Sequence, residues 1–218
     1  MNEFVLYSSS VIIIDLLISN LIYNRLVTWY IIHAYCNLYV IIKCIPYILL
    51  FFNEPIKSLQ NTEELNIHYY AVIPHIYHCI AFKLNYDDIF HHVLFVFFGV
   101  IFKLYCNVGI SLAFYLFFIN GLPGMIDYIM LSLYKFSRIS KHTRHITALY
   151  LNSWFRCPGL IFSNSLFIFH ILINTNILYK KILKILFSIL LWSYNGLYYN
   201  YQVRDSYTKC YQMKELQN

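Results

Sequence analysis

Two acidic and two histidine side chains lie together in the segment 85–98, NYDDIFHHVLFVFF, which is otherwise mostly apolar. On a helix, Asp87 precedes His91 by one turn and Asp88 precedes His92 by one turn, so each carboxylate can reach an imidazole. Such a pairing fixes the tautomer of the ring and raises its basicity, which suits a general base or a nucleophile. Alternatively, the two acids only complement the dipole of the first helical turn, and the histidines lie at the headgroup level. The residues leave both interpretations open.

A second histidine pair, His75 and His78, lies one helical turn apart in the sequence HIYHCIAF. With the adjacent pair it suggests a metal site, because membrane di-iron desaturases and hydroxylases use histidine boxes. Those boxes have HxxxH and HxxHH spacings, and this chain has neither pattern. We therefore expect no metal and no cofactor. We assign to the wall of a lipid pocket His33, His75, His78, Asn152 and Arg156.

Asp127 and Arg156 are the two candidates in the second half of the chain. Asp127 follows GLPG, where Gly and Pro predict a break in the helix at Gly121–Gly124. A helix that restarts there exposes its positive dipole end, which stabilises a carboxylate. Arg156 lies in NSWFRCPG, in the middle of a later apolar segment, with Asn152 one turn earlier on the same face. An Asp127–Arg156 ion pair would be the purely structural explanation for both residues.

The elements that carry these residues are membrane helices. Of the 218 residues, 60% are hydrophobic and 12% are charged, and the mean hydropathy is +0.56. This composition is typical of a multi-pass membrane protein with one bundle and no second domain. An ionised side chain at the centre of a bilayer costs on the order of 2.5–3.5 kcal/mol, so such groups are expected to face the bundle interior. Asp15 and Lys43 can be tolerated near helix ends, and we expect His170 to make a structural hydrogen bond.

A span of the hydrocarbon core needs about 20 apolar residues. The first apolar segment has no basic n-region and no small-residue cleavage site, so we expect a retained helix rather than a removed signal peptide. We predict an all-α, multi-pass transmembrane helical bundle with seven spans, at about 4–23, 26–52, 69–84, 88–104, 107–137, 143–173 and 180–202.

The basic residues predict the orientation of the bundle. The formal charge is +6, but there is no basic stripe with interleaved aromatics, so we expect no nucleic-acid partner. With seven spans, one side of the membrane holds Arg25, Lys83, Lys135, Arg138, Lys141, Arg144, Arg204, Lys209 and Lys214, and the other holds Lys57, Lys103, Lys180, Lys181 and Lys184. The positive-inside rule therefore favours a lumenal or exterior N-terminus and a cytosolic C-terminus.

Five stretches of the chain carry a family resemblance: RLVTWYIIHAYCNLYV (25–40), HIYHCIAFKLNYDDIFHHVLFVFF (75–98), INGLPGMIDYIMLSLYK (119–135), NSWFRCPG (152–159) and YNGLYYNYQV (194–203). In this order they resemble the TLC-domain membrane proteins, the family that includes the ceramide synthases. The resemblance covers about 25–203 and implies a six-helix TLC-type domain, commonly preceded by one extra helix. It divides the chain into an N-terminal transmembrane helix (1–24), the TLC-like domain (25–203) and a polar C-terminal tail (204–218).

The resemblance also implies what the site does. In the ceramide synthases the adjacent histidines belong to the catalytic site, which joins a fatty acyl group from acyl-CoA to a sphingoid amine. By resemblance, His91 and His92 match that pair, and Asp127 matches a downstream acid. The synthases carry further acids about one turn from that position, where this chain has Ile129, Met130 and Leu131.

That departure brings the chain closer to the non-synthase members, which act in membrane lipid composition, sensing or trafficking. We therefore expect a protein that handles lipids within an endoplasmic-reticulum-type membrane, with membrane lipids as partners. The alternative is an acyl-CoA-dependent N-acyltransferase that uses the His91–His92 pair. A transporter or channel is a third class, but the chain has neither a transmembrane repeat nor a polar stripe.

Overall fold

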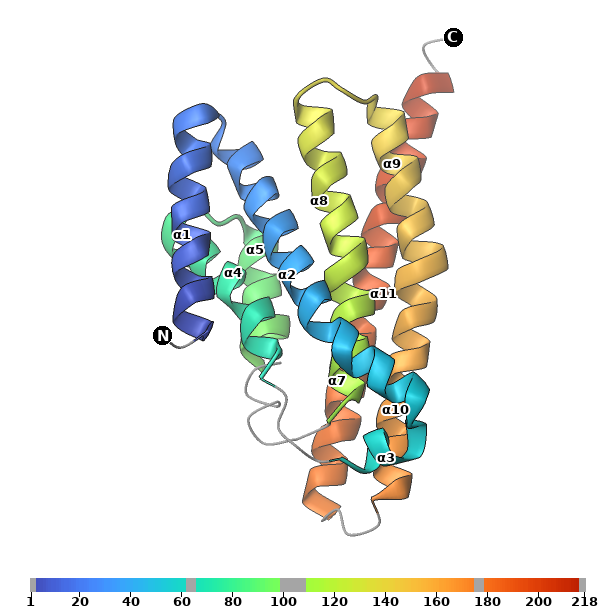
Figure 1. The fold of residues 1–218 in the computed structure, drawn as a ribbon. Helices are drawn as coiled ribbons and strands as arrows, with labels where there is room; N and C mark the ends of the chain where they lie inside the picture. Colours follow the sequence, from blue (N-terminus) through green and yellow to red (C-terminus); the bar gives the residue numbers. More distant parts are fainter. Residues whose placement is uncertain (1–2, 62–65, 99–108, 175–178, 216–218) are drawn as a thin grey trace.

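The computed structural model describes residues 3–61, 66–98, 109–174 and 179–215, and this part of the chain is helical without a β-strand (Figure 1). The α-helices are α1 (Glu3–Leu21), α2 (Arg25–Asn53), α3 (Pro55–Gln60), α4 (His68–Ala81), α5 (Tyr86–His91), α7 (Ser111–Tyr115), α8 (Leu122–Lys135), α9 (Lys141–Tyr150), α10 (Cys157–Ile173) and α11 (Tyr179–Glu215). Three π-helical segments continue them, namely η1 (His92–Phe97) after α5, η2 (Leu116–Gly121) between α7 and α8, and η3 (Leu151–Arg156) between α9 and α10.

Within the described residues, four helices are long and apolar enough to cross a membrane. They are α1, α2, the continuous helix Ser111–Lys135 and the continuous helix Lys141–Ile173. They correspond to the first, second, fifth and sixth of the seven predicted spans, so the all-α class is confirmed for the described residues and four of the spans are supported by length and apolar composition. The outer faces of these helices are apolar, with Leu16, Leu17, Ile161 and Leu172 all more than half exposed.

The other three predicted spans do not meet the same criteria. The third, predicted at 69–84, is α4, whose 14 residues reach only about 21 Å, less than the ~30 Å of a hydrocarbon core. The fourth, predicted at 88–104, extends beyond the described residues after Phe98. The seventh, predicted at 180–202, is part of the 37-residue α11, which is long but much less apolar than the four helices above.

The chain alternates between two ends of the bundle (Figure 1). The α1–α2 turn, the α8–α9 turn and the last turns of α11 lie at one end, drawn at the top of the figure. The segment after α4 lies there too, because Arg25 Nη2 donates a hydrogen bond to the Ala81 carbonyl over 3.4 Å. The α3 helix lies at the opposite end. The turns predicted to share one side of the membrane therefore share one end of the structure.

Polar contacts join the first helices to one another. Asp15 on α1 accepts hydrogen bonds from Arg25 Nη1 at 2.5 Å and Nη2 at 3.2 Å, and from the Tyr77 hydroxyl of α4 at 2.5 Å. Lys43 forms an ion pair with Glu3. Asp15 and Lys43 are thus paired structural residues, which explains how the apolar helices tolerate them.

His170 is a structural residue, as predicted. Its Nδ1 donates a hydrogen bond to the Leu59 carbonyl over 2.8 Å and so fastens the end of α10 to α3.

The predicted break at Gly121–Gly124 is wrong. The helix runs without interruption from Ser111 to Lys135, and the irregularity takes the form of the π-helical segment η2, which ends two residues before Pro123. In the same way, η3 ends two residues before Pro158. A proline ring clashes with the carbonyl four residues earlier and offers no amide hydrogen to it. A wider turn before the proline relieves that clash and keeps the helix continuous.

Candidate functional site

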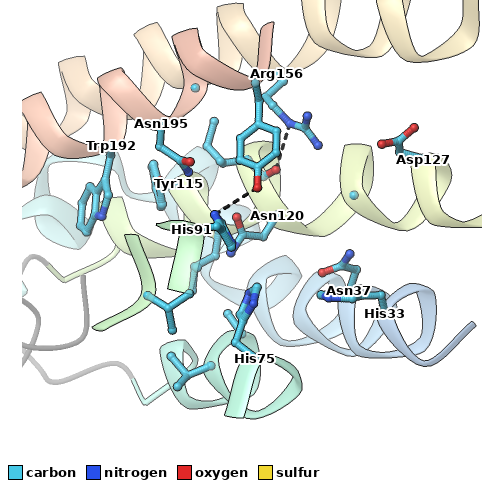
Figure 2. A pocket seen from close by; sticks show the side chains of 18 of the residues that line it. His33, Asn37, His75, His91, Tyr115, Asn120, Asp127, Arg156, Trp192 and Asn195 are labelled. Carbon is cyan, nitrogen blue, oxygen red and sulfur yellow. Dashed lines mark hydrogen bonds between the residues drawn. The ribbon is translucent and has the colours of Figure 1, made fainter. Parts of the chain in front are cut away.

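A cavity of about 230 Å³, called here the central cavity, lies inside the bundle (Figure 2). Its wall comes from α2, α4, the end of α5 and η1, the helix from α7 to α8, the end of η3, and α11. A single water needs only ~10–15 Å³ measured in this way, so the space holds far more than one water. Apolar side chains form much of the wall, among them Val72, Leu112, Leu116, Leu131 and Trp192.

Five of the eight site residues predicted from the sequence line this cavity. They are His33, His75, His91, Asp127 and Arg156, which come from five different elements. Figure 2 shows these side chains around one space, with Asp127 at its margin. The structure therefore brings these five residues together around one space.

The imidazoles of His33, His75 and His91 form a row along the wall. The ring centroids of His33 and His75 are 5.5 Å apart, and those of His75 and His91 are 5.2 Å apart. His33 also stacks on Tyr128 at 4.2 Å with nearly parallel rings. His91 Nδ1 is 3.0 Å from the Tyr199 hydroxyl of α11, so that hydrogen bond holds its ring orientation.

His92, His78 and Asn152 do not line the cavity. Because His92 is the next residue on the helix, its ring points elsewhere, and its Nδ1 lies 3.3 Å from the sulfur of Cys79. His78 is buried against Trp29, with ring centroids 4.0 Å apart. The predicted catalytic pair is thus divided, and only His91 can meet a molecule in the cavity.

Asp88 caps the helix that carries His91. Its backbone N–H donates to Asn85 Oδ1, and its carboxylate accepts from the Asn85 N–H, each over 2.9 Å. This reciprocal pair is a capping box, which satisfies two backbone donors at a helix start. The structure therefore supports the helix-start interpretation of Asp88.

Asp127 and Arg156 both line the cavity, but each contacts a different group. The Asp127 carboxylate lies 3.6 Å from Arg144 Nη2 of α9, and both side chains are mostly buried. Arg156 donates from Nε to the Ile119 carbonyl over 3.1 Å and from Nη1 to Asn152 Oδ1 over 2.7 Å. The proposed structural explanation by an Asp127–Arg156 pair is therefore wrong.

The contact of Arg156 with Ile119 has a cause in the sequence. Pro123 is four residues after Ile119 and has no N–H for that carbonyl, so the oxygen needs a donor from elsewhere. Arg156 Nε supplies it across the interface between η3 and η2. Asn152 holds the guanidinium in place, and its own Nδ2 donates to the Ala148 carbonyl over 2.8 Å.

Each π-helical segment contributes residues to the cavity: Val96 from η1, Leu116, Ile119 and Asn120 from η2, and Arg156 from η3. Extra residues in single π turns occur frequently at functional sites, because they turn side chains away from the regular helical register. The three irregular turns thus surround the same space.

Eight polar or aromatic wall residues were not predicted from the sequence: Asn37, His68, Tyr115, Asn120, Tyr128, Trp192, Asn195 and Tyr199. Several polar atoms in the wall lack a hydrogen-bond partner among the described residues, namely His33 Nδ1, His75 Nδ1 and Asn195 Oδ1. Buried polar atoms of this kind normally have a partner. The wall therefore has unused hydrogen-bonding capacity for an occupant.

The described residues contain no group of three or more His, Cys, Asp or Glu side chains with the geometry of a metal site.

Comparisons with known proteins add no further assignment: no family model, curated protein or solved structure matches this chain.

Proposed function

We propose that this protein is a TLC-type membrane protein that binds a lipid in the central cavity. The observation that carries the proposal is a roomy cavity with a polar wall inside a bundle whose outer helices are apolar. Ionisable groups at membrane depth mark functional sites, and pockets between bundle helices commonly hold ligands. The family resemblance of 25–203 supports lipids as the ligand class and a six-helix TLC arrangement after one N-terminal helix.

The membrane placement belongs to the same proposal. The turns that carry most of the basic residues lie at one end of the bundle, so the positive-inside rule places that end in the cytosol. The N-terminus is then lumenal and the C-terminus cytosolic, in an endoplasmic-reticulum-type membrane. Reporter proteins fused to either terminus test this orientation, and a lumenal C-terminal reporter would refute it.

The lipid proposal is tested by filling the cavity. Ala71 on α4 is a wall residue, and Ala71→Phe would place a ring in the space, whereas Ile80 on the same helix is 79% exposed. We expect purified Ala71→Phe protein to retain much less co-purified lipid than the wild type, and Ile80→Phe protein to retain as much. Equal lipid retention by all three proteins, measured by mass spectrometry of the extracts, would refute a lipid in the cavity.

The second candidate is a ceramide-synthase-like acyltransferase, and it is favoured by the position of His91. In this reaction the amine nitrogen attacks the thioester carbonyl of acyl-CoA, the C–N bond forms and the C–S bond breaks. His91, held by Tyr199, would take the amine proton and return it to the leaving thiolate.

Purified protein with acyl-CoA and a sphingoid base tests this candidate. Catalysis by His91 predicts that His91→Ala lowers amide formation at least ~10²-fold and that His92→Ala has a much smaller effect. If the wild type forms no amide but retains lipid, the catalytic proposal is refuted and the lipid-binding proposal stands.

A further inference from the structure

The central cavity has an excess of positive charge. Among the described wall residues, Asp127 and Arg156 carry the formal charges, and Asp127 is already paired with Arg144. Two arginines and one aspartate leave one positive charge, and protonation of any wall histidine would only increase it.

Among the described residues, Arg156 has no acidic partner that compensates its charge. Both of its hydrogen-bond partners, the Ile119 carbonyl and the Asn152 amide oxygen, are neutral. They satisfy Nε and Nη1 but do not neutralise the guanidinium, and Nη2 has no partner in the described part of the chain. A partly buried arginine without an anion is unfavourable, so an anionic occupant would stabilise it.

The rest of the wall suits the head of a lipid. A guanidinium offers a planar fork of donors that matches a carboxylate or phosphate. The apolar side chains of Val72 and Leu131 provide surface for a hydrocarbon chain.

We propose that the central cavity binds an anionic lipid whose carboxylate or phosphate oxygens pair with Arg156. This inference rests on the lipid-binding function proposed above and adds the chemical class of the headgroup.

Three probes with the same hydrocarbon chain test it: oleate, oleoyl lysophosphatidate and the neutral oleyl alcohol. Each displaces a radiolabelled lipid from the protein in zwitterionic nanodiscs, with empty nanodiscs correcting for partitioning. We expect at least one anionic probe to bind at least about tenfold more tightly than the alcohol, the ratio that one extra charged contact supplies. Preference for oleate identifies a carboxylate ligand, and preference for lysophosphatidate identifies a phosphate ligand.

Three variants assign the preference to Arg156. Arg156→Gln keeps hydrogen-bond donors but removes the charge, so the ratio of anionic-probe affinity to alcohol affinity should fall to about one. Arg156→Lys keeps the charge and should keep most of this affinity ratio. Lys57→Gln removes one exposed positive charge far from the cavity and should leave the ratio unchanged. If Arg156→Gln does not fold, the comparison is repeated in the Pro123→Ala background, where residue 123 has an N–H for Ile119.

The outcomes separate this inference from the function on which it rests. If all three probes bind equally, or if the affinity ratio is unchanged in Arg156→Gln, the proposal of an anionic headgroup is refuted and the lipid-binding proposal stands. Binding of none of the probes refutes both proposals. Displacement by acetate or inorganic phosphate as effective as by the lipids identifies a small-anion site and refutes the lipid ligand.

Discussion

The hydrogen bond between Arg156 Nε and the Ile119 carbonyl predicts an energetic coupling between Arg156 and Pro123. Arg156→Met removes two hydrogen bonds donated by a charged group, at 3.1 Å and 2.7 Å. Bonds of this type contribute about 1.5–3 kcal/mol each, and loss of a partner leaves a buried oxygen unsatisfied. The neutral methionine also removes a charge that is unfavourable without an anion, so we expect a net loss of about 2 kcal/mol in the free energy of unfolding.

Pro123→Ala should reduce that loss. An alanine at this position has an N–H that can bond to the Ile119 carbonyl, so this oxygen no longer depends on Arg156. The contact with Asn152 is lost in both backgrounds, and the change therefore concerns one hydrogen bond. We expect Arg156→Met to be about 1 kcal/mol less destabilising in the Pro123→Ala background than in the wild type, which a double-mutant cycle measures.

Titration with sodium dodecyl sulfate in mixed micelles, followed by tryptophan fluorescence, gives the four unfolding free energies. Arg144→Met is the matched control, because it removes a nearby arginine whose ion-pair partner is Asp127 and not Ile119. Its effect should be the same in both backgrounds. If the effect of Arg156→Met is also the same in both, Arg156 does not replace the donor that Pro123 lacks, and the reasoning is wrong.

Two further predictions concern helix packing and use the same titration. Gly159→Ala would place a Cβ 2.4 Å from the Phe118 Cβ, so we expect overpacking to lower the free energy of unfolding by about 1–3 kcal/mol. An unchanged free energy of unfolding would contradict the close approach of α10 and η2. Asp15→Asn removes the carboxylate that accepts two hydrogen bonds from Arg25, so we expect a loss of about 1.5–3 kcal/mol. Asp205→Asn, in an exposed ion pair, should have a much smaller effect, and equal effects of the two substitutions would show that the buried network is not stabilising.

Apart from His68, the part of the site that could be predicted from the sequence is the part that carries charge or can acquire it. His33, His75, His91, Asp127 and Arg156 are unfavourable against lipid wherever they occur in an apolar segment, and this alone directs them to the interior. Neutral polar residues give no comparable signal, since an asparagine or tyrosine is tolerated at interfaces and in helix contacts. Asn195 and Tyr199 were therefore missed, although both lie in a segment that contributed to the family resemblance.

The sequence could not predict how neighbouring side chains divide between the cavity and its surroundings. Consecutive helical residues point about 100° apart, so the adjacent pair does not show by itself which of His91 and His92 lines the cavity. The partner of Asp127 is equally hidden, because Arg144 is near it only in the folded bundle. Hydropathy also overestimates the spans, since it measures apolar character and α4 ends after 14 residues.

Pro123 shows why the position of an irregularity is easier to predict than its form. The residues GLPG predict a disturbed helix because proline removes a donor and glycine weakens the helix. Whether the chain breaks or widens depends on what can satisfy the carbonyl that loses its donor, and here a side chain 37 positions later does so. The helix continues through the wider η2 turn, and Arg156 supplies a donor to the Ile119 carbonyl.

That dependence gives a physical reason for an arginine in the middle of a membrane helix. Nε holds η3 to η2 through the Ile119 carbonyl, and Nη1 bonds to Asn152 within η3. Both partners are neutral oxygens, so the described residues do not neutralise the positive charge. Nη2, the third nitrogen, has no protein partner among the described residues, and Arg156 lines the cavity. In our proposal, an anionic lipid completes this arrangement, and occupancy of the cavity stabilises the same helix contact that Pro123 makes necessary. Ligand binding and helix packing would then be linked through one side chain, so an anionic lipid should raise the unfolding free energy of the wild type and not that of Arg156→Gln.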